Sequence, residues 1–192
     1  MVSPDVELYL AFLLLLALER VGELLLSARN ARRAFARGAH EVGQRHYRVM
    51  AALHTLFLFS CAAEVLFLRR PFPGLPGFLA LGVAVLAQVL RYGAILTLGE
   101  RWNTRVIVIP DSEPVTRGPY RFLRHPNYVA VVAELAAVPL IHGAWVTAVV
   151  FTLANAFLLR VRIRAEEEAL GTRYQRAFAK MPRFIPELSR KP

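Results

Sequence analysis

The sequence predicts an all-α integral membrane bundle of about five transmembrane helices, the last two forming a hairpin that continues into a cytoplasmic C-terminal helix. Of the 192 residues, 56% are hydrophobic and the mean hydropathy is +0.40. Soluble domains have roughly 45 to 50% apolar residues. The apolar residues also gather into runs that approach the roughly 20 residues a membrane-spanning helix needs. We expect a single domain, with three spans in residues 1–98 and a loop, the hairpin and the last helix in residues 99–192.

The charge of the chain is strongly basic. Lys and Arg outnumber Asp and Glu by 24 to 14, which gives a formal net charge of +10. In a soluble protein this excess would suggest nucleic acid. Here the basic residues lie between apolar runs and in the tail, as the positive-inside rule and anionic lipid explain. We therefore predict membrane lipids, and not nucleic acid, as partners. The single cysteine excludes an intrachain disulfide and a thiolate metal site, and we predict no metal.

The first predicted span begins with the apolar run Leu8–Leu18 and extends to about Leu26. No positive patch precedes it, so it is expected to be a retained helix rather than a signal peptide. Three charged residues stand near its far end, Glu19, Arg20 and Glu23. We interpret them as a solvated helix terminus, with a polar cavity as the alternative.

The segment between the first two spans fixes the predicted orientation. Residues 27–48 carry one acidic residue against six arginines: Arg29, Arg32, Arg33, Arg37, Arg45 and Arg48. This loop is expected in the cytoplasm, which places the N-terminus outside and the candidate site described below at the cytoplasmic face. The short, Arg- and Ala-rich chain is typical of a bacterial protein, so we expect it in a bacterial cytoplasmic membrane.

The second and third predicted spans are Val49–Leu68 and Leu75–Leu98. In the second, His54 is interpreted as a packed helix residue, and Glu64 as reaching the interface or pairing with Arg69 or Arg70. In the third, Arg91 is expected to extend to the headgroups, with a cavity open to the cytoplasm as the alternative.

The run Val129–Leu159 is about half again too long for one span. Pro139, His142 and Gly143 predict a break within it and therefore a hairpin. Glu134 and Asn155 are expected to form hydrogen bonds with neighbouring helices.

The candidate site begins in the segment Gly118–Tyr128, Gly-Pro-Tyr-Arg-Phe-Leu-Arg-His-Pro-Asn-Tyr. Gly118-Pro119 is typical of a turn, Pro126 disfavours a helical His125, and Asn127 is predicted to cap the following helix. A helix start favours anionic or polar ligand groups. The alternative is a basic loop at the membrane edge with interfacial aromatics. The loop that leads here, Gly99–Arg124, is long enough to be functional.

A second polar set follows the hairpin. Arg162 and Glu166 stand four residues apart, on one face of the predicted last helix. They leave the membrane at the same face as the Gly118–Tyr128 segment. The two sets are therefore expected to meet over the cytoplasmic mouth of the bundle.

These residues resemble the isoprenylcysteine carboxyl methyltransferases, and the chain is similar to small bacterial members of that family. The resemblance rests on three pieces in the family's order and spacing: Gly118-x-Tyr120 with Arg124-His125-Pro126-Asn127-Tyr128, Arg162-Ile163-x-x-Glu166-Glu167-x-x-Leu170, and Pro182-Arg183-Phe184-Ile185-Pro186. It implies an integral membrane O-methyltransferase that transfers a methyl group from S-adenosylmethionine to a carboxylate or hydroxyl of a lipophilic acceptor, such as a prenyl, polyketide or phenolic lipid.

The resemblance also implies roles for individual residues. The residues expected to surround the cofactor are Arg105, Ser112, Glu113, Pro114, Val115, Tyr120, His125, Pro126, Asn127, Tyr128 and Glu166. Arg162 would lie at the acceptor end, both binding the acceptor and acting in catalysis. A carboxylate acceptor needs no general base, and Arg162 can orient it. For a hydroxyl acceptor, Glu134, Glu167 and His125 are candidate bases.

Two other functions remain open at this stage. Sterol-reductase-type membrane enzymes share a similar Gly-x-Tyr and Arg-His-Pro-x-Tyr region but use a reduced nicotinamide cofactor. A small transporter or scaffold is the non-catalytic alternative, and it predicts polar residues spread through the spans rather than gathered at one face.

Overall fold

A computed structural model describes residues 3–184 as five long helices with a small sheet. The helices are α1 (Pro4–Phe35), α2 (Gln44–Phe67), α3 (Leu75–Leu98), α4 (Pro126–Leu140) and α5 (Trp145–Ala177). The strands are β1 (His40–Val42) and β2 (Val106–Val108), and two short 3-10 turns are η1 (Gly99–Arg101) and η2 (Gly118–Arg121).

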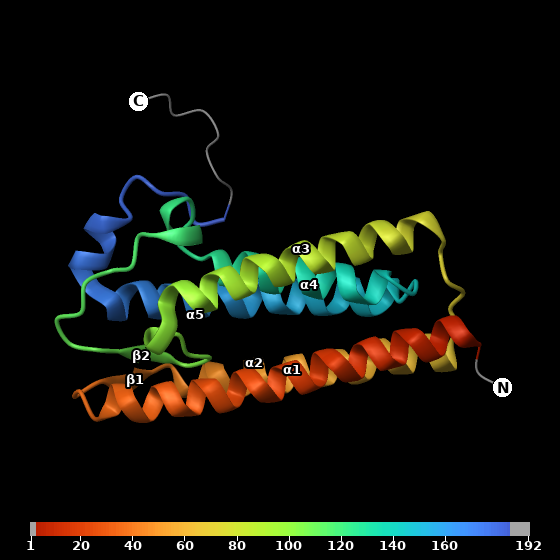
Figure 1. The fold of residues 1–192 in the computed structure, drawn as a ribbon, viewed down its shortest axis with the longest axis horizontal. Coiled ribbons are helices and arrows are strands. Elements are labelled where there is room, and N and C mark those ends of the chain that lie inside the picture. Colours follow the sequence, from red (N-terminus) through yellow and green to blue (C-terminus); the bar gives the residue numbers. More distant parts are fainter. Residues whose placement is uncertain (1–2, 185–192) are drawn as a thin grey trace.

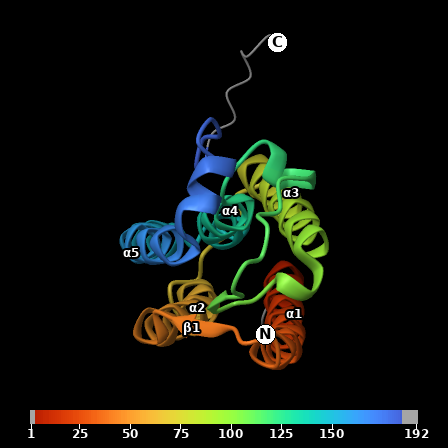
Figure 2. The same ribbon diagram turned by 90° about the vertical axis from the view of Figure 1, so that its left-hand side faces the viewer.

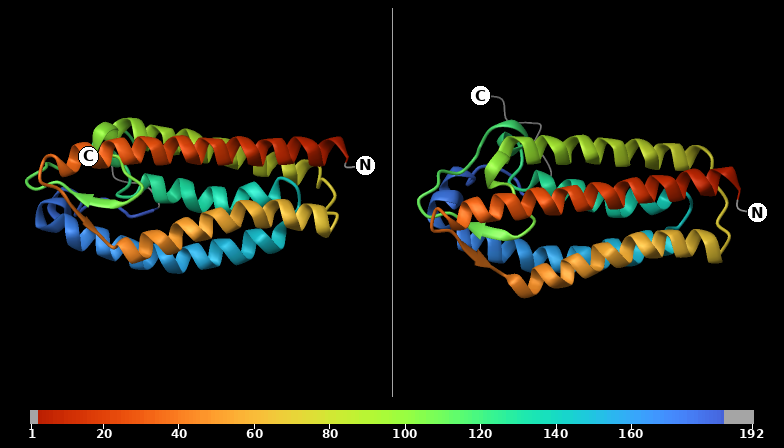
Figure 3. Two further views of the ribbon diagram at one scale, coloured as in Figure 1. Left: turned by 90° about the horizontal axis from the view of Figure 1, so that it is seen from below. Right: turned by 60° about the horizontal axis from the view of Figure 1, so that its bottom comes forward.

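The five helices lie roughly parallel in one elongated bundle (Figure 1). Viewed from one end, the segment between α3 and α4 crosses that end of the bundle (Figure 2). The first turn of α1 lies at the opposite end, and both strands lie near the crossing segment (Figure 3). The segment that contains most of the candidate site residues therefore lies at one end of the bundle.

The helices carry large apolar side chains on their outer faces. Leu14, Phe59, Leu86, Leu96 and Phe157 are each more than 60% exposed. Among the described residues, α2, the stretch Leu75–Arg101 and α5 are long and apolar enough to cross a membrane. Such exposed surface requires an apolar solvent. The count of five transmembrane helices stays a prediction.

The first helix is longer than predicted. α1 continues to Phe35, through the first nine of the 22 residues (27–48) expected to be a loop. Ala and Arg favour helix, and Ser27, Asn30, Ala31 and Ala34 are buried, so packing extends the helix beyond its apolar run.

The sheet is absent from the all-α prediction. β1 pairs antiparallel with β2, with Glu41 opposite Ile107. The β-branched residues of β2 favour this conformation. The pairing ties the α1–α2 connection to the segment that precedes the candidate site.

The predicted hairpin break is confirmed, since α4 ends at Leu140 and α5 begins at Trp145. Glu64 of α2 accepts hydrogen bonds from the backbone N–H groups of Val146 and Thr147 at the start of α5. It also pairs with Arg70 at 2.9 Å, one of the two predicted partners. A carboxylate at this position satisfies otherwise unpaired helix N–H groups.

The last helix bends at Gly171, where φ is 70° and ψ is −164°. This conformation is essentially restricted to glycine. The bend directs Tyr174 and Phe178 toward Ala94 and Tyr120, with which they form a small apolar cluster. The C-terminal turns of α5 therefore lie against the segment before α4.

Replacing Gly171 with Ala is expected to lower the free energy of unfolding by about 1 to 3 kcal/mol, because alanine is strained in this conformation. Thermal unfolding in detergent measures the change. Gly82→Ala is the matched control, since Gly82 lies inside α3 with open space around its Cα, and it should not destabilise. Equal unfolding temperatures for Gly171→Ala and wild type would contradict the bend.

Candidate active site in the polar end of the bundle

A cavity of about 560 Å³ lies in the polar end of the bundle. All five helices contribute to its wall, together with β2 and the segment after it. This volume is within the usual range for small-molecule sites. His125 and Glu166 both line it, so the predicted meeting of the two polar sets at one chamber is confirmed.

The start of α4 differs by two residues from the prediction. His125 (φ −129°) is the N-cap and Pro126 occupies the first helical turn, which suits its fixed φ and missing N–H. Asn127 is therefore inside the helix and does not cap it. Its Oδ1 is buried without a hydrogen-bond partner among the described residues, and the residue lines the cavity.

Tyr128 joins the two polar sets. Its hydroxyl donates to Glu166 Oε2 and accepts a 2.7 Å hydrogen bond from Arg162 Nε. Arg162 Nη2 also donates to the Thr104 carbonyl at 2.6 Å. Arg162 is thus fixed by α4 and by the segment before β2, and among residues 3–184 its Nη1 has no hydrogen-bond partner.

His125 is held by the last helix. Its Nε2 lies 3.0 Å from Glu167 Oε1, and its ring stacks on that of Tyr128 with centroids 5.2 Å apart. Arg183 Nη2 donates to the same carboxylate at 2.5 Å, and this hydrogen bond raises the pKa of the Arg183 guanidinium. Ile185 and Pro186 of the closing motif lie outside the described residues.

Glu167 therefore has a different position from that expected of a base. It does not line the cavity. Glu134 and Pro126 do not line it either, and Pro126 is fully buried. On a helix Glu167 lies about 100° from Glu166, so only one of the two adjacent carboxylates borders the chamber. The sequence pattern alone did not show which of Glu166 and Glu167 borders the cavity.

The segment before η2 forms the opposite wall. Ser112, Glu113, Pro114, Val115 and Tyr120 all line the cavity. Burial raises the pKa of the Tyr120 phenol well above its ordinary value, so the hydroxyl stays neutral. Arg105 lines the cavity too, but its Nη1 is 2.9 Å from Glu41 Oε2, so its side chain is partly committed to β1.

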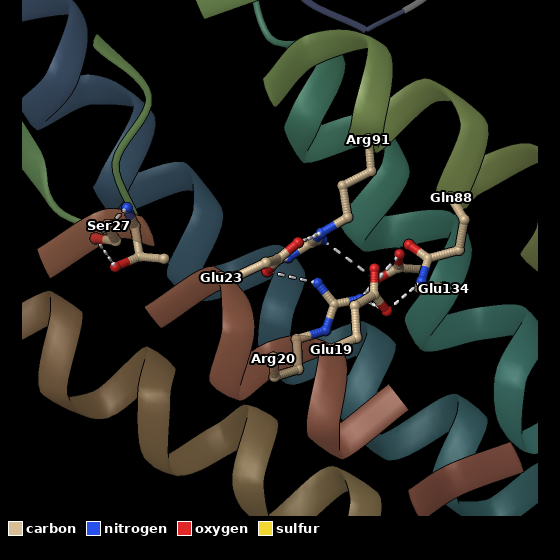
Figure 4. A network of polar contacts seen from close by, with 8 residues as sticks. Glu19, Arg20, Glu23, Ser27, Gln88, Arg91 and Glu134 are labelled. Carbon is tan, nitrogen blue, oxygen red and sulfur yellow. Dashed lines mark hydrogen bonds and ion pairs between the residues drawn. The ribbon is translucent and has the colours of Figure 1, made fainter. Parts of the chain in front are cut away.

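The inner end of the cavity is bordered by a cluster of buried charges (Figure 4). Arg91 of α3 makes a paired hydrogen bond to Glu23 of α1, at 2.5 and 2.8 Å. Arg20 donates to Glu23 at 2.8 Å and to Glu134 of α4 at 3.0 Å. Arg20, Glu23 and Arg91 line the cavity.

This cluster corrects two predictions. Glu19, Arg20 and Glu23 are not a solvated helix terminus, because α1 continues for three more turns, and Arg91 does not extend to the headgroups. The alternative, a polar cavity, is observed for Arg20, Glu23 and Arg91, whereas Glu19 does not line the cavity and accepts a hydrogen bond from Gln88. Glu134 meets the expectation of a bond to neighbouring helices, whereas the buried amide of Asn155 has no partner among the described residues.

Sequence reasoning also missed Ser27 and Asn103. Ser27 donates to Asn103 Oδ1 at 2.7 Å, and Asn103 returns a hydrogen bond to the Ser27 carbonyl at 3.0 Å. These contacts hold the segment before β2 against α1, where its Thr104 carbonyl meets Arg162. No short motif in the sequence signals them.

Comparison with known proteins identifies the family. The sequence profile of the isoprenylcysteine carboxyl methyltransferase family matches residues 80–172. The chain is 39% identical over 159 residues to the uncharacterized protein YpbQ of Bacillus subtilis, covering 81% of this chain and 92% of that one. The chain belongs to this family.

More distant relatives agree. The chain is 30% identical over 113 residues to the protein-S-isoprenylcysteine O-methyltransferase of Schizosaccharomyces pombe, covering 56% of this chain and 48% of that enzyme. A solved eukaryotic intramembrane Ras methyltransferase ICMT shares the fold, with a TM-score of 0.65 and 24% identity over 98% of this chain and 70% of its own. This protein is thus an integral, multi-pass membrane methyltransferase of a family whose enzymes use S-adenosylmethionine as methyl donor.

The cavity residues suit this donor. Asn127 Oδ1 is a buried acceptor without a partner in the described part of the chain, and such an atom is costly unless a ligand satisfies it. Glu166 offers a carboxylate to a cationic group, and Tyr120 and Tyr128 offer ring faces. When bound, the donor supplies an electrophilic methyl group on a sulfonium.

Replacing Tyr128 with Phe is expected to weaken binding of S-adenosylhomocysteine by about tenfold or more, because it removes a hydrogen bond to each of two charged groups. Isothermal calorimetry in detergent measures the change. Tyr92→Phe is the control, since Tyr92 is exposed and outside the cavity lining. Equal affinities for Tyr128→Phe and wild type would show that the two hydrogen bonds of the Tyr128 hydroxyl do not contribute to donor binding.

Proposed function

We propose that the chain methylates a lipophilic acceptor on oxygen, with the methyl donor at the Asn127–Glu166 side of the cavity and the acceptor oxygen near Arg162. The observation that carries this proposal is the Tyr128 hydroxyl, which bonds Glu166 and Arg162 at once. One side chain thereby sets the relative position of the two proposed subsites.

In the proposed donor subsite, Glu166 binds the cationic amino group of S-adenosylmethionine, and Asn127 binds a second polar group of the same molecule. His125 and Tyr128 enclose it with their stacked rings, and residues 112–115 close the other side. Arg105 stands at the rim with its charge paired to Glu41. Pro126 does not contact the donor but fixes where α4 begins. Glu167 positions His125.

In the proposed acceptor subsite, Arg162 Nη1 directs the acceptor oxygen. Its other nitrogens are held by Tyr128 and by the Thr104 carbonyl, so the side chain cannot turn away. Methyl transfer from a sulfonium is an in-line displacement, for which alignment and exclusion of water supply much of the rate. A fixed guanidinium serves that alignment. Glu134 and Glu167 are not retained as candidate bases, since neither lines the cavity.

We further propose that the cavity faces the cytoplasm. The end of the bundle that contains it carries the basic segment of residues 27–48, whereas Arg69 and Arg70 lie at the other end, in the α2–α3 connection. The positive-inside rule therefore supports a cytoplasmic cavity and an external N-terminus. A water-soluble donor then enters from the cytoplasm and a lipid acceptor from the bilayer.

Calorimetry with the purified protein tests the function. We expect binding of S-adenosylhomocysteine and no binding of NADPH, and the reverse result would favour the reductase alternative. Glu166→Ala should weaken S-adenosylhomocysteine about tenfold or more, since a hydrogen bond to a charged group contributes about 1.5 to 3 kcal/mol. Glu168→Ala, an exposed carboxylate on the same helix, should bind like wild type. Undiminished binding by Glu166→Ala would contradict the assignment.

Arg162→Ala should lower kcat/KM for the acceptor by about tenfold or more, with a smaller loss of S-adenosylhomocysteine affinity. Steady-state kinetics with a lipid acceptor and calorimetry measure the two effects. Arg164→Ala is the matched control, because Arg164 is exposed two residues further along α5. Unchanged kinetics in Arg162→Ala would remove this residue from the acceptor subsite.

A further inference from the structure

The residues Met181, Pro182 and Arg183, which follow the last helix, have no role in the function proposed above. They do not line the cavity, but they are bonded to the residue that precedes His125. The backbone N–H of Arg124 donates to the Pro182 carbonyl at 3.0 Å, and Arg124 Nε donates to the Met181 carbonyl at 2.6 Å. Residues 181–183 therefore form a strap across the connection between η2 and α4.

Apolar packing fixes the beginning of this strap. Met181 packs against the cluster formed by Ala94, Tyr120 and Phe178, in which Phe178 is only 1% exposed. Its backbone N–H also donates to the Phe178 carbonyl at 3.0 Å. The backbone that carries Arg183 is thus held by its neighbours and does not depend on the contacts of the Arg183 side chain.

Arg183 makes a paired hydrogen bond with Glu167 of α5. Its Nε lies 3.0 Å from Oε1 and its Nη2 lies 2.5 Å from Oε2. The side chain of Glu167 is 11% exposed and that of Arg183 is 51% exposed, so the guanidinium reaches an enclosed carboxylate from the surface. A planar guanidinium that bonds both oxygens fixes the orientation of a carboxylate, which a single ammonium contact does not.

The oriented carboxylate in turn holds the ring of His125. Glu167 Oε1 lies 3.0 Å from His125 Nε2, and an ionised carboxylate only accepts hydrogen bonds, so Nε2 carries a proton. His125 lines the cavity, whereas Glu167 does not. The hydrogen bond that holds this ring against Tyr128 therefore comes from a residue behind the cavity wall.

We propose that Arg183 is a positioning residue of the donor subsite, which acts through Glu167 to keep the His125 imidazole in place beside Tyr128. The inference rests on the proposed function. Without the guanidinium, the Glu167 carboxylate is free to rotate and His125 loses its oriented partner. Part of the binding free energy of the donor is then spent on ordering the ring. The donor subsite is thus completed by a segment that follows the last helix.

A double-mutant cycle with Arg183→Gln and Glu167→Gln tests whether the two side chains act as one unit. Calorimetry with S-adenosylhomocysteine measures each affinity, and thermal unfolding in detergent reports on folding. Arg183→Gln should weaken binding about threefold to fivefold, as expected for an ion pair that is half exposed to solvent. Arg176→Gln is the matched control, because Arg176 is exposed on α5 outside the cavity lining, and it should bind like wild type.

The double variant should bind S-adenosylhomocysteine no more weakly than Glu167→Gln alone. Losses that multiply would show that Arg183 acts by a route other than Glu167 and would overturn the proposal, as would wild-type affinity in Arg183→Gln. Arg183→Lys retains the charge without the paired geometry, so its affinity should lie between those of Arg183→Gln and wild type. Failure of wild type to bind S-adenosylhomocysteine would instead overturn the proposed function itself.

A spectroscopic measurement reports on the ring directly. In ligand-free protein labelled with ¹⁵N-histidine, Nε2 of His125 should carry a proton. The signals of His125 should change in Arg183→Gln, while those of the other histidines stay as in wild type. The resonances of His125 are assigned by their loss in His125→Asn. An unprotonated Nε2 in wild type, or His125 signals that Arg183→Gln leaves unchanged, would contradict the positioning role.

Discussion

The charged cluster between α1, α3 and α4 is the interaction on which the arrangement of the bundle depends. In an apolar solvent each carboxylate and guanidinium must find its partners inside the protein. Glu23 and Glu134 each accept from both Arg20 and Arg91. Removing one member of such a set leaves a buried charge uncompensated, which typically costs about 3 to 5 kcal/mol. The cluster therefore fixes three helices against one another, and its inner surface shapes the cavity.

The same constraint explains how a site for two unlike ligands is built. The polar loop and the start of α4 lie at one end of the bundle, and Arg162, at the proposed acceptor subsite, lies on α5. Tyr128, on the shortest helix, bonds to both sides. Because α4 begins inside the protein at the buried His125, Asn127 and Tyr128 of its first turn border the cavity.

Much of this was predictable from the sequence. The five long helices follow from the lengths of the apolar runs, and the break between Pro139 and Gly143 follows from its turn residues. The proximity of the Gly118–Tyr128 segment to Glu166 follows from the alternation of the helices along the bundle. The path of α1 through residues 27–35, the pairing of β1 with β2 and the partners of Arg20, Glu23 and Arg91 were not. They depend on contacts between segments far apart in the chain, and a charged residue in an apolar run has the same local pattern whether it pairs or reaches the surface. Glu166 and Glu167 could not be separated for a related reason: their roles depend on the rotation of α5 about its axis.

The contact between Glu64 and the first turn of α5 has a consequence for biogenesis. The backbone N–H of Val146 lies 82 residues after the Glu64 carboxylate to which it donates a hydrogen bond. Glu64 is therefore synthesised well before the start of α5. Its other partner, Arg70, lies only six residues further along the chain. The carboxylate that binds the start of α5 is therefore synthesised before the hairpin.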